Sequence, residues 1–83
     1  MFIELKYFAA LREELDTPSE RFETDATTVA GLLLALRERG GAHAQALSAG
    51  RSLRVAVNHV MARPDTPIPP GAEVGIFPPV TGG

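Results

Sequence analysis

A single segment of this chain has the spacing of a helix with one buried face. Four aliphatic residues recur there at intervals of three and four positions: Val29, Leu32, Leu33 and Leu36. Thr27 or Thr28 precedes the segment as a helix cap, and Gly40-Gly41 follows it as a stop signal. Because an apolar helix face must be buried against another element, the rest of the chain has to supply the surface that covers it.

Short segments on both sides of this helix alternate between apolar and polar residues, as strands with one buried face do. In residues 2–8, Ile3, Leu5 and Tyr7 share one face, which is predicted to point into the core. The remaining strands are expected at residues 20–24, 53–57, 60–62 and 73–77. Strands of this length with one apolar face form a sheet that can cover the helix.

The order of these elements indicates the class of fold. Strands before and after one main helix are typical of an α+β domain in which a mixed sheet packs on that helix. We expect the first and last strands to pair in parallel at the centre of the sheet. Short helical segments are expected at residues 9–15 and 42–49, with a turn at Asn58-His59. A chain of 83 residues has room for one small domain.

Composition excludes several classes of function. The net charge is -2 and the acids and bases are mixed along the chain, so no basic cluster is available for nucleic-acid binding. Cysteine is absent, which removes disulfides, thiolate metal sites and cysteine nucleophiles. The apolar stretches are too short to span a bilayer, and residues 1–8 lack the pattern of a signal peptide. We therefore expect a cytoplasmic protein that does not associate with membranes.

Few side chains are suited to catalysis. His43 and His59 are the two histidines, and both are expected to be solvated, because a metal site would need further ligands. The serines do not lie in a nucleophile elbow, and no glycine-rich loop opens a helix to hold a phosphate. No metal site is expected, and the most distinctive reactive group is the terminal carboxylate of Gly83.

The segment that leads to Gly83 is expected to be a thin, extended arm. Pro78 and Pro79 start it and stiffen the backbone, and Val80, Thr81 and Gly82 complete it. The last two glycines bring no side chain that would shield the carboxylate. Such an arm fits a narrow channel in another protein, where adenylation would activate the carboxylate. The alternative is a frayed tail without a function.

Three large apolar residues fall on strand faces that are predicted to point outward. Phe8 is out of phase with the buried residues of the first strand, Phe77 with those of the last strand, and Met61 lies between two small or branched residues. If the first and last strands are neighbours, Phe8 and Phe77 share an exposed patch at the root of the arm, and Arg12 adds a charge at its rim. Exposed apolar patches of this kind mark protein interfaces. The alternatives are a different strand phase or a loop that covers the patch.

Four stretches of the chain together resemble the small subunits of molybdopterin synthase. They are YFAALRE at residues 7–13, VN at 57–58, DTPI at 65–68 and EVGIFPPVTGG at 73–83. The resemblance spans nearly the whole chain, and the combination of its first and last stretches is specific. One departure is Ala72, where the family usually has an acidic residue; it affects a loop contact.

The resemblance implies a fold and a chemistry. Members of this family are sulfur carriers with a ubiquitin-like β-grasp fold, here residues 1–77, followed by a diglycine tail at residues 78–83. An E1-like adenylyltransferase uses ATP to activate the carboxylate of Gly83, which then becomes a thiocarboxylate. The carrier itself binds no cofactor. Its sulfur passes to precursor Z and builds the dithiolene of molybdopterin, in a catalytic pocket that belongs to the large subunit.

The resemblance also implies where partners bind. The tail, from Pro78 to Gly82, enters the large subunit, and the complex is a heterotetramer with one small subunit at each end of a large-subunit dimer. By position, Phe8, Met61 and Phe77 match hydrophobic contact residues of the family, and Arg12 matches a charged one. The chain is then a sulfur-donating subunit without an active site of its own.

Three other interpretations are compatible with the sequence. The sulfur carrier of thiamine synthesis shares the fold and the ending, although its start lacks the pattern of residues 8–13. A ubiquitin-like modifier would be joined through Gly83 to lysines of target proteins. A plain interaction domain would have an inert tail, and removal of Gly82-Gly83 would leave its function unchanged.

Overall fold

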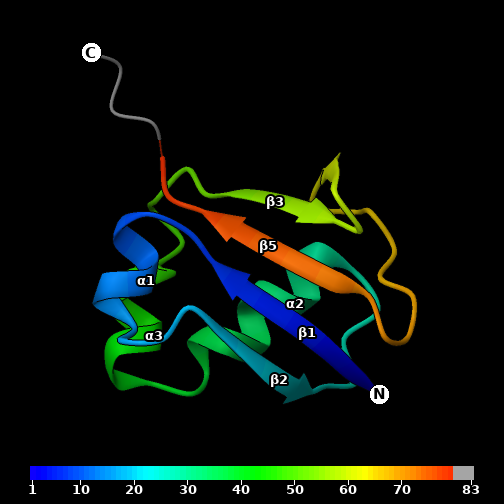
Figure 1. The fold of residues 1–83 in the computed structure, drawn as a ribbon, viewed down its shortest axis with the longest axis horizontal. Helices are drawn as coiled ribbons and strands as arrows, with labels where there is room; N and C mark the ends of the chain where they lie inside the picture. The colour runs from blue at the N-terminus through cyan, green and yellow to red at the C-terminus, as the bar shows by residue number, and fades with distance from the viewer. Residues whose placement is uncertain (80–83) are drawn as a thin grey trace.

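The computed structural model describes residues 1–79 and contains one mixed sheet with helices on one of its faces (Figure 1). In chain order the elements are β1 (Phe2–Tyr7), α1 (Ala10–Glu14), β2 (Ser19–Glu23), α2 (Val29–Arg37), α3 (Gly41–Ala46), β3 (Arg54–Val57), β4 (Val60–Ala62) and β5 (Glu73–Phe77). The strands and the main helix follow the predicted order, so the α+β prediction is confirmed. Within residues 1–79, no helix has the length and apolar character that crossing a membrane requires.

The sheet has the strand order β2-β1-β5-β3-β4. The first and last strands, β1 and β5, lie side by side at its centre and run in parallel, as predicted, with Leu5 opposite Val74 and Tyr7 opposite Ile76. All other neighbouring strands are antiparallel. Because β1 and β5 are parallel, both end at the same edge of the sheet, and the residues that follow them are brought together.

The core lies between the sheet and α2. Thr28 is the cap of α2, since its Oγ1 accepts a hydrogen bond of 3.2 Å from the backbone N–H of Gly31. Leu32 and Leu36 on the buried face of α2 are fully buried, as are Ile3 and Leu5 of β1. Each such aliphatic side chain stabilises the fold by about 1.5–3 kcal/mol relative to an exposed one. The spacing seen in the sequence thus defines the face that packs on the sheet.

Two details differ from the sequence-based expectation. Helix α2 ends at Arg37, and Gly40 and Gly41 both have positive φ, of 76° and 53°, in the link that leads straight into α3. The two glycines therefore join two helices and do not simply stop one of them. Ala72 is buried in the core beside β5, so the departure from the family pattern adds an apolar contact to the core.

Candidate functional site

The two aromatic residues that were predicted to face outward meet at one edge of the sheet. Phe8 follows β1 and Phe77 ends β5, and their rings stack with centroids 4.4 Å apart and planes inclined by 6°. The backbone N–H of Phe8 donates to the carbonyl oxygen of Ile76, which extends the pairing of β1 with β5 past the end of β1. Phe8 remains 38% exposed. The prediction that Phe8 and Phe77 share a patch is confirmed.

Gly75 provides the space in which the ring of Phe8 lies. A Cβ atom at position 75 would be 3.0 Å from Cε2 of Phe8 and 3.5 Å from Cε1 of Phe77. A distance of 3.0 Å is tighter than nine in ten real Cβ contacts, so a side chain there would require the ring of Phe8 to shift by a few tenths of an ångström. Close packing of two rings over the backbone of β5 therefore depends on a residue without a side chain.

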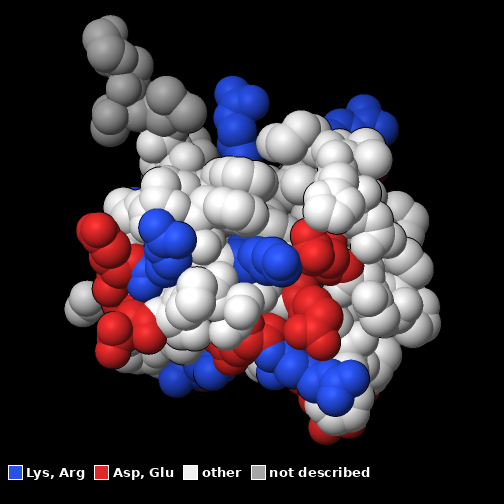
Figure 2. All heavy atoms as spheres, in the orientation of Figure 1, with Lys and Arg blue, Asp and Glu red and all other residues white. Residues whose placement is uncertain are grey.

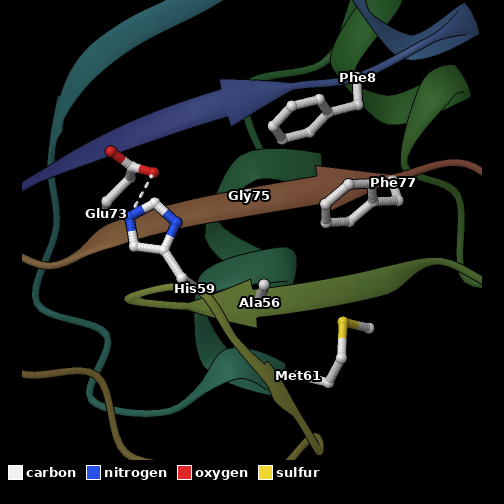
Figure 3. A pocket seen from close by; sticks show the side chains of 7 residues that line it. All are labelled: Phe8, Ala56, His59, Met61, Glu73, Gly75 and Phe77. Atoms are coloured by element: carbon white, nitrogen blue, oxygen red, sulfur yellow. Dashed lines mark ion pairs between the residues drawn. The ribbon is translucent and has the colours of Figure 1, made fainter.

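The face of the sheet that the helices do not cover is called the outer face. Beside the stacked rings this face has a cavity of about 210 Å³ (Figure 3). It is lined by Phe8, Ala56, His59, Met61, Glu73, Gly75 and Phe77. The register places Gly75, Ala56 and Met61 in one row across β5, β3 and β4. Ala56 faces this side and is 9% exposed, whereas Met61 at the rim is 57% exposed. A small floor between large apolar walls is a shape that accepts a side chain of a partner.

One end of the cavity is polar. His59 Nε2 lies 3.4 Å from Oε2 of Glu73 (Figure 3). The Lys6 Nζ lies 3.6 Å from Oε1 of the same carboxylate. Asn58 fixes Glu73 from the other side, because its Oδ1 accepts from the Glu73 N–H and its own N–H donates to the Glu73 carbonyl. Both residues of the turn, Asn58 and His59, have positive φ. The predicted turn is confirmed, but its role in shaping the cavity was not foreseen.

The predicted site residues divide into four groups, three within the described part of the chain and one outside it. Phe8, Met61 and Phe77 come together around the cavity. Arg12 is exposed on α1 and does not line the cavity. Pro78 and Pro79 follow β5 and are partly buried. The remaining predicted residues lie outside the described part of the chain: Val80, Thr81, Gly82 and Gly83.

A second polar cluster lies on the helix side of the sheet and corrects the expectation for His43. The Tyr7 hydroxyl donates to Oε2 of Glu20 at 2.7 Å, and Arg39 Nη1 donates to Oε1 at 2.9 Å. His43 packs edge-on against Tyr7, and its Nε2 is buried 3.6 Å from Oε2 of Glu20. His43 is therefore not solvated, because α3 holds it over the end of β1. His59, in contrast, is exposed as predicted.

Burial and hydrogen bonding within this cluster shift the pKa values of Tyr7 and Glu20. Burial, together with the hydrogen bond to the Glu20 carboxylate, raises the pKa of Tyr7. Burial alone would also raise the pKa of Glu20, but the hydrogen bonds from Tyr7 and Arg39 outweigh it and lower that pKa below its ordinary value. In the described residues no group of three or more His, Asp or Glu side chains is placed to hold a metal ion. The contacts of the cluster join Tyr7 and Glu20 of the sheet to Arg39, which follows α2, and to His43 of α3.

Comparison with known proteins gives consistent matches. The model of the ThiS family matches residues 5–83. The molybdopterin synthase sulfur carrier subunit of Escherichia coli is 37% identical over 98% of this chain and 99% of its own length. The protein of the same name from Haemophilus influenzae is 34% identical over 93% and 94%. The crystal structure of SAMP1 from Haloferax volcanii superposes with a TM-score of 0.78 at 29% identity, covering both chains completely.

Proposed function

This chain belongs to the ThiS family, and from that premise we propose that it is the sulfur carrier subunit of a molybdopterin synthase. The observation that carries the proposal is the match to two carriers of that name at 34–37% identity over nearly their full length. A ubiquitin-like fold of the kind seen in its structural neighbours supports it. The outer face, with its stacked Phe8 and Phe77, adds a surface suited to a protein partner.

The chemistry that we propose takes place at the carboxylate of Gly83. An E1-like enzyme transfers AMP from ATP to this carboxylate and releases pyrophosphate, which makes a mixed anhydride. A hydrosulfide ion then attacks the carbonyl carbon, forms the C–S bond and expels AMP, which leaves a thiocarboxylate on the carrier. This chemistry needs no cofactor held by the carrier. We propose that this ATP-consuming chemistry takes place in the cytoplasm.

The docking step that we propose uses the outer face at the end of β5. The large synthase subunit would cover Phe8, Phe77 and Met61, with Arg12 at the rim, while the tail from Pro78 to Gly83 enters its catalytic pocket. Phe77 is joined directly to the tail, so a partner that binds the stacked rings also fixes the point from which the tail starts. Two carriers would bind a dimer of large subunits to form a heterotetramer, and each would donate sulfur to precursor Z.

Mass spectrometry of the intact chain tests this function directly. The protein is incubated with the E1-like enzyme of the same organism, ATP and a sulfur source, and then with the large subunit and precursor Z. We expect a mass gain equal to the exchange of one oxygen for sulfur, located at Gly83, and its loss when molybdopterin forms. A chain without Gly82-Gly83 serves as the control and should gain nothing while remaining folded. An unchanged mass with an enzyme that is active on another carrier would contradict the proposal.

A second candidate function is conjugation to other proteins. It is favoured by the likeness to SAMP1, the small archaeal modifier protein 1 of Haloferax volcanii, at 29% identity. A modifier would be joined through Gly83 to lysine side chains of its targets. Species of higher mass that carry an isopeptide bond to Gly83 in cells would support this function, and their absence under conditions that produce the thiocarboxylate would argue against it.

A further inference from the structure

Basic side chains from two strands, β1 and β3, lie near the stacked rings of Phe8 and Phe77. Arg54 of β3 is directly opposite Phe77 in the register, so both side chains lie on the outer face. Lys6 precedes Phe8 by two residues on β1 and is opposite Gly75, again on this face. Figure 2 shows Lys and Arg atoms on several sides of an uncharged area of this face. A chain with a net charge of -2 therefore has basic residues on the side of its apolar patch where β1 and β5 end, while Glu73 lies on the other side.

Acidic side chains of the strands gather toward the other end of the same face. Glu4 of β1 is opposite Glu73 of β5, and Glu23 of β2 is opposite Phe2 at the start of β1. The Arg21 guanidinium partly neutralises this end, at 3.4 Å from Glu4. Charge on the strands is thus polarised along their direction, from acidic where β1 and β5 begin to basic where they end.

The basic groups nearest the rings are available to a partner. Within residues 1–79 neither Arg54 nor Arg12 takes part in an ion pair, and both are exposed. Lys6 is 3.6 Å from Glu73, but such an exposed pair contributes only about 0–1 kcal/mol and is easily exchanged for another partner. These cations therefore contribute little to the stability of the folded chain.

We propose that the partner covering this patch presents an apolar side chain flanked by carboxylates. Arg54 and Lys6 would select this partner and set the direction in which it docks. The proposal rests on the proposed function, since the partner is taken to be the large synthase subunit. Its acidic groups would face the ends of β1 and β5, and would be repelled by Glu4, Glu23 and Glu73 if the subunit docked in the reverse direction. Arg54 is the more informative residue to change, because the register places it directly opposite Phe77.

Charges at the rim of an interface act mainly on the rate of association and on the choice of partner. Oppositely charged surfaces raise the association rate constant at low salt, and the gain shrinks as salt shortens the range of the field, from about 10 Å at 0.1 M to about 3 Å at 1 M. A role for Arg54 in partner selection therefore has a signature that a purely structural role would lack, namely a rate effect that depends on salt.

The test measures the association rate constant between the full-length chain and the large synthase subunit of the same organism, by stopped-flow fluorescence at two salt concentrations. Arg54→Glu is the main variant and Arg54→Gln is the milder one; Lys6→Gln reports on the second cation. Arg63→Glu is the matched control, because it changes the net charge equally from an exposed loop position that does not line the cavity. Circular dichroism and thermal melting establish that each variant is folded.

We expect Arg54→Glu to slow association by about tenfold near 0.05 M salt, the neutral variants to slow it by less, and the differences to shrink near 1 M salt. Arg63→Glu should have a much smaller effect. Equal slowing by Arg54→Glu and Arg63→Glu, or faster association of Arg54→Glu, would overturn the proposal. If the unaltered chain does not bind the large subunit at all, the proposed function fails; if it binds and Arg54 has no effect, this inference alone fails.

Discussion

Tyr7 and Phe8 are adjacent in the chain and belong to two regions with opposite roles. Tyr7 is 2% exposed, points toward the helices and donates a hydrogen bond to a carboxylate that Arg39 also holds. Phe8 points to the outer face, is 38% exposed and stacks on Phe77 of the neighbouring strand β5. The inner region is tied by short hydrogen bonds, whereas the outer region combines exposed rings with ion pairs of 3.4–3.6 Å.

One of these aromatic residues stabilises the fold, and the other has a surface that is available to a partner. Burying a polar group is costly unless it is hydrogen-bonded, and Tyr7 meets that requirement through Glu20. The ring of Phe8 carries no polar group and is partly exposed to water. Covering this apolar surface would therefore favour the binding of a partner. Alternation along one strand thus places a structural residue and a candidate binding residue side by side.

The largest effect on stability is expected from Tyr7→Ala. Loss of a buried aromatic side chain typically lowers the free energy of unfolding by about 3–5 kcal/mol, and the hydrogen bond to Glu20 is lost with it. Phe8→Ala should cost far less, because the ring is partly exposed already. Urea denaturation of both variants measures the contrast. Similar losses for Tyr7→Ala and Phe8→Ala would mean that Phe8 belongs to the core.

The largest effect on binding is expected from Phe77→Ala. Removing one ring of the stack should weaken binding of the large synthase subunit by about 1–3 kcal/mol, the range for an interface anchor, with little loss of stability. Leu34→Ala is the matched control, since Leu34 is an apolar residue of α2 that is 55% exposed on the helix side. Titration calorimetry compares the two. A large fall in melting temperature with unchanged affinity would place Phe77 in the core and out of the interface.

A smaller effect, confined to the inner region, is expected from Glu20→Gln. Loss of charge-assisted hydrogen bonds should lower the free energy of unfolding at pH 7 by about 1 kcal/mol, below the usual range of about 1.5–3 kcal/mol for such bonds, since Glu20 is partly exposed. Affinity for the large subunit should not change. Chemical denaturation and a binding titration on the same variant separate the two properties, and a clear loss of affinity in a folded variant would break the division between the regions.

The same carboxylate predicts how stability depends on pH. Because the pKa of Glu20 is lower in the folded state than its ordinary value of 4.5, the ionised form stabilises the fold above that pH. Its contribution is lost as the pH falls from 4.5 through the lowered pKa. Melting temperatures measured across this acid range should therefore fall more steeply for the unaltered chain than for Glu20→Gln. Parallel curves would show that Glu20 gains nothing from Tyr7 and Arg39.

The smallest effect is expected from Gly75→Ala. The added methyl group would sit 3.0 Å from the ring of Phe8 and push it outward, while the change from glycine reduces the flexibility of the unfolded chain. We expect the free energy of unfolding to change by less than about 1 kcal/mol and the affinity for the large subunit to weaken slightly. Tighter binding would show that the observed stacking of Phe8 on Phe77 is not the geometry that the partner selects.

Much of the fold was predictable because its signals are local. The spacing in α2 and the alternation in β1 each define a buried face, and parallel pairing of β1 with β5 followed from their places in the order. The phase of Phe8 and Phe77, together with the expectation that the first and last strands are neighbours, predicted that the two residues meet. These predictions needed only the periodicity of each segment and one statement about which strands are neighbours.

The rest depends on register and on contacts between distant segments. His43 was expected in solvent, but α3 folds back so that its imidazole lies beside Glu20, 23 residues earlier in the chain. Likewise, the position of Arg54 beside Phe77 follows from the pairing of β3 with β5, which no local pattern determines. The turn Asn58-His59 was predicted from the sequence. The hydrogen bond that Asn58 Oδ1 accepts from the Glu73 N–H was not, because it depends on where β5 lies beside the turn.

The most direct test of the docking account is methyl NMR of the two methionines. The chain contains only Met1 and Met61, and Met61 lines the cavity on the outer face while Met1 packs against the core. Methyl groups labelled with ¹³C report on each separately as the large synthase subunit is added. We expect the signal of Met61 to shift and that of Met1 to keep its position. A complex that shifts Met1 and leaves Met61 unchanged would contradict docking through the outer face.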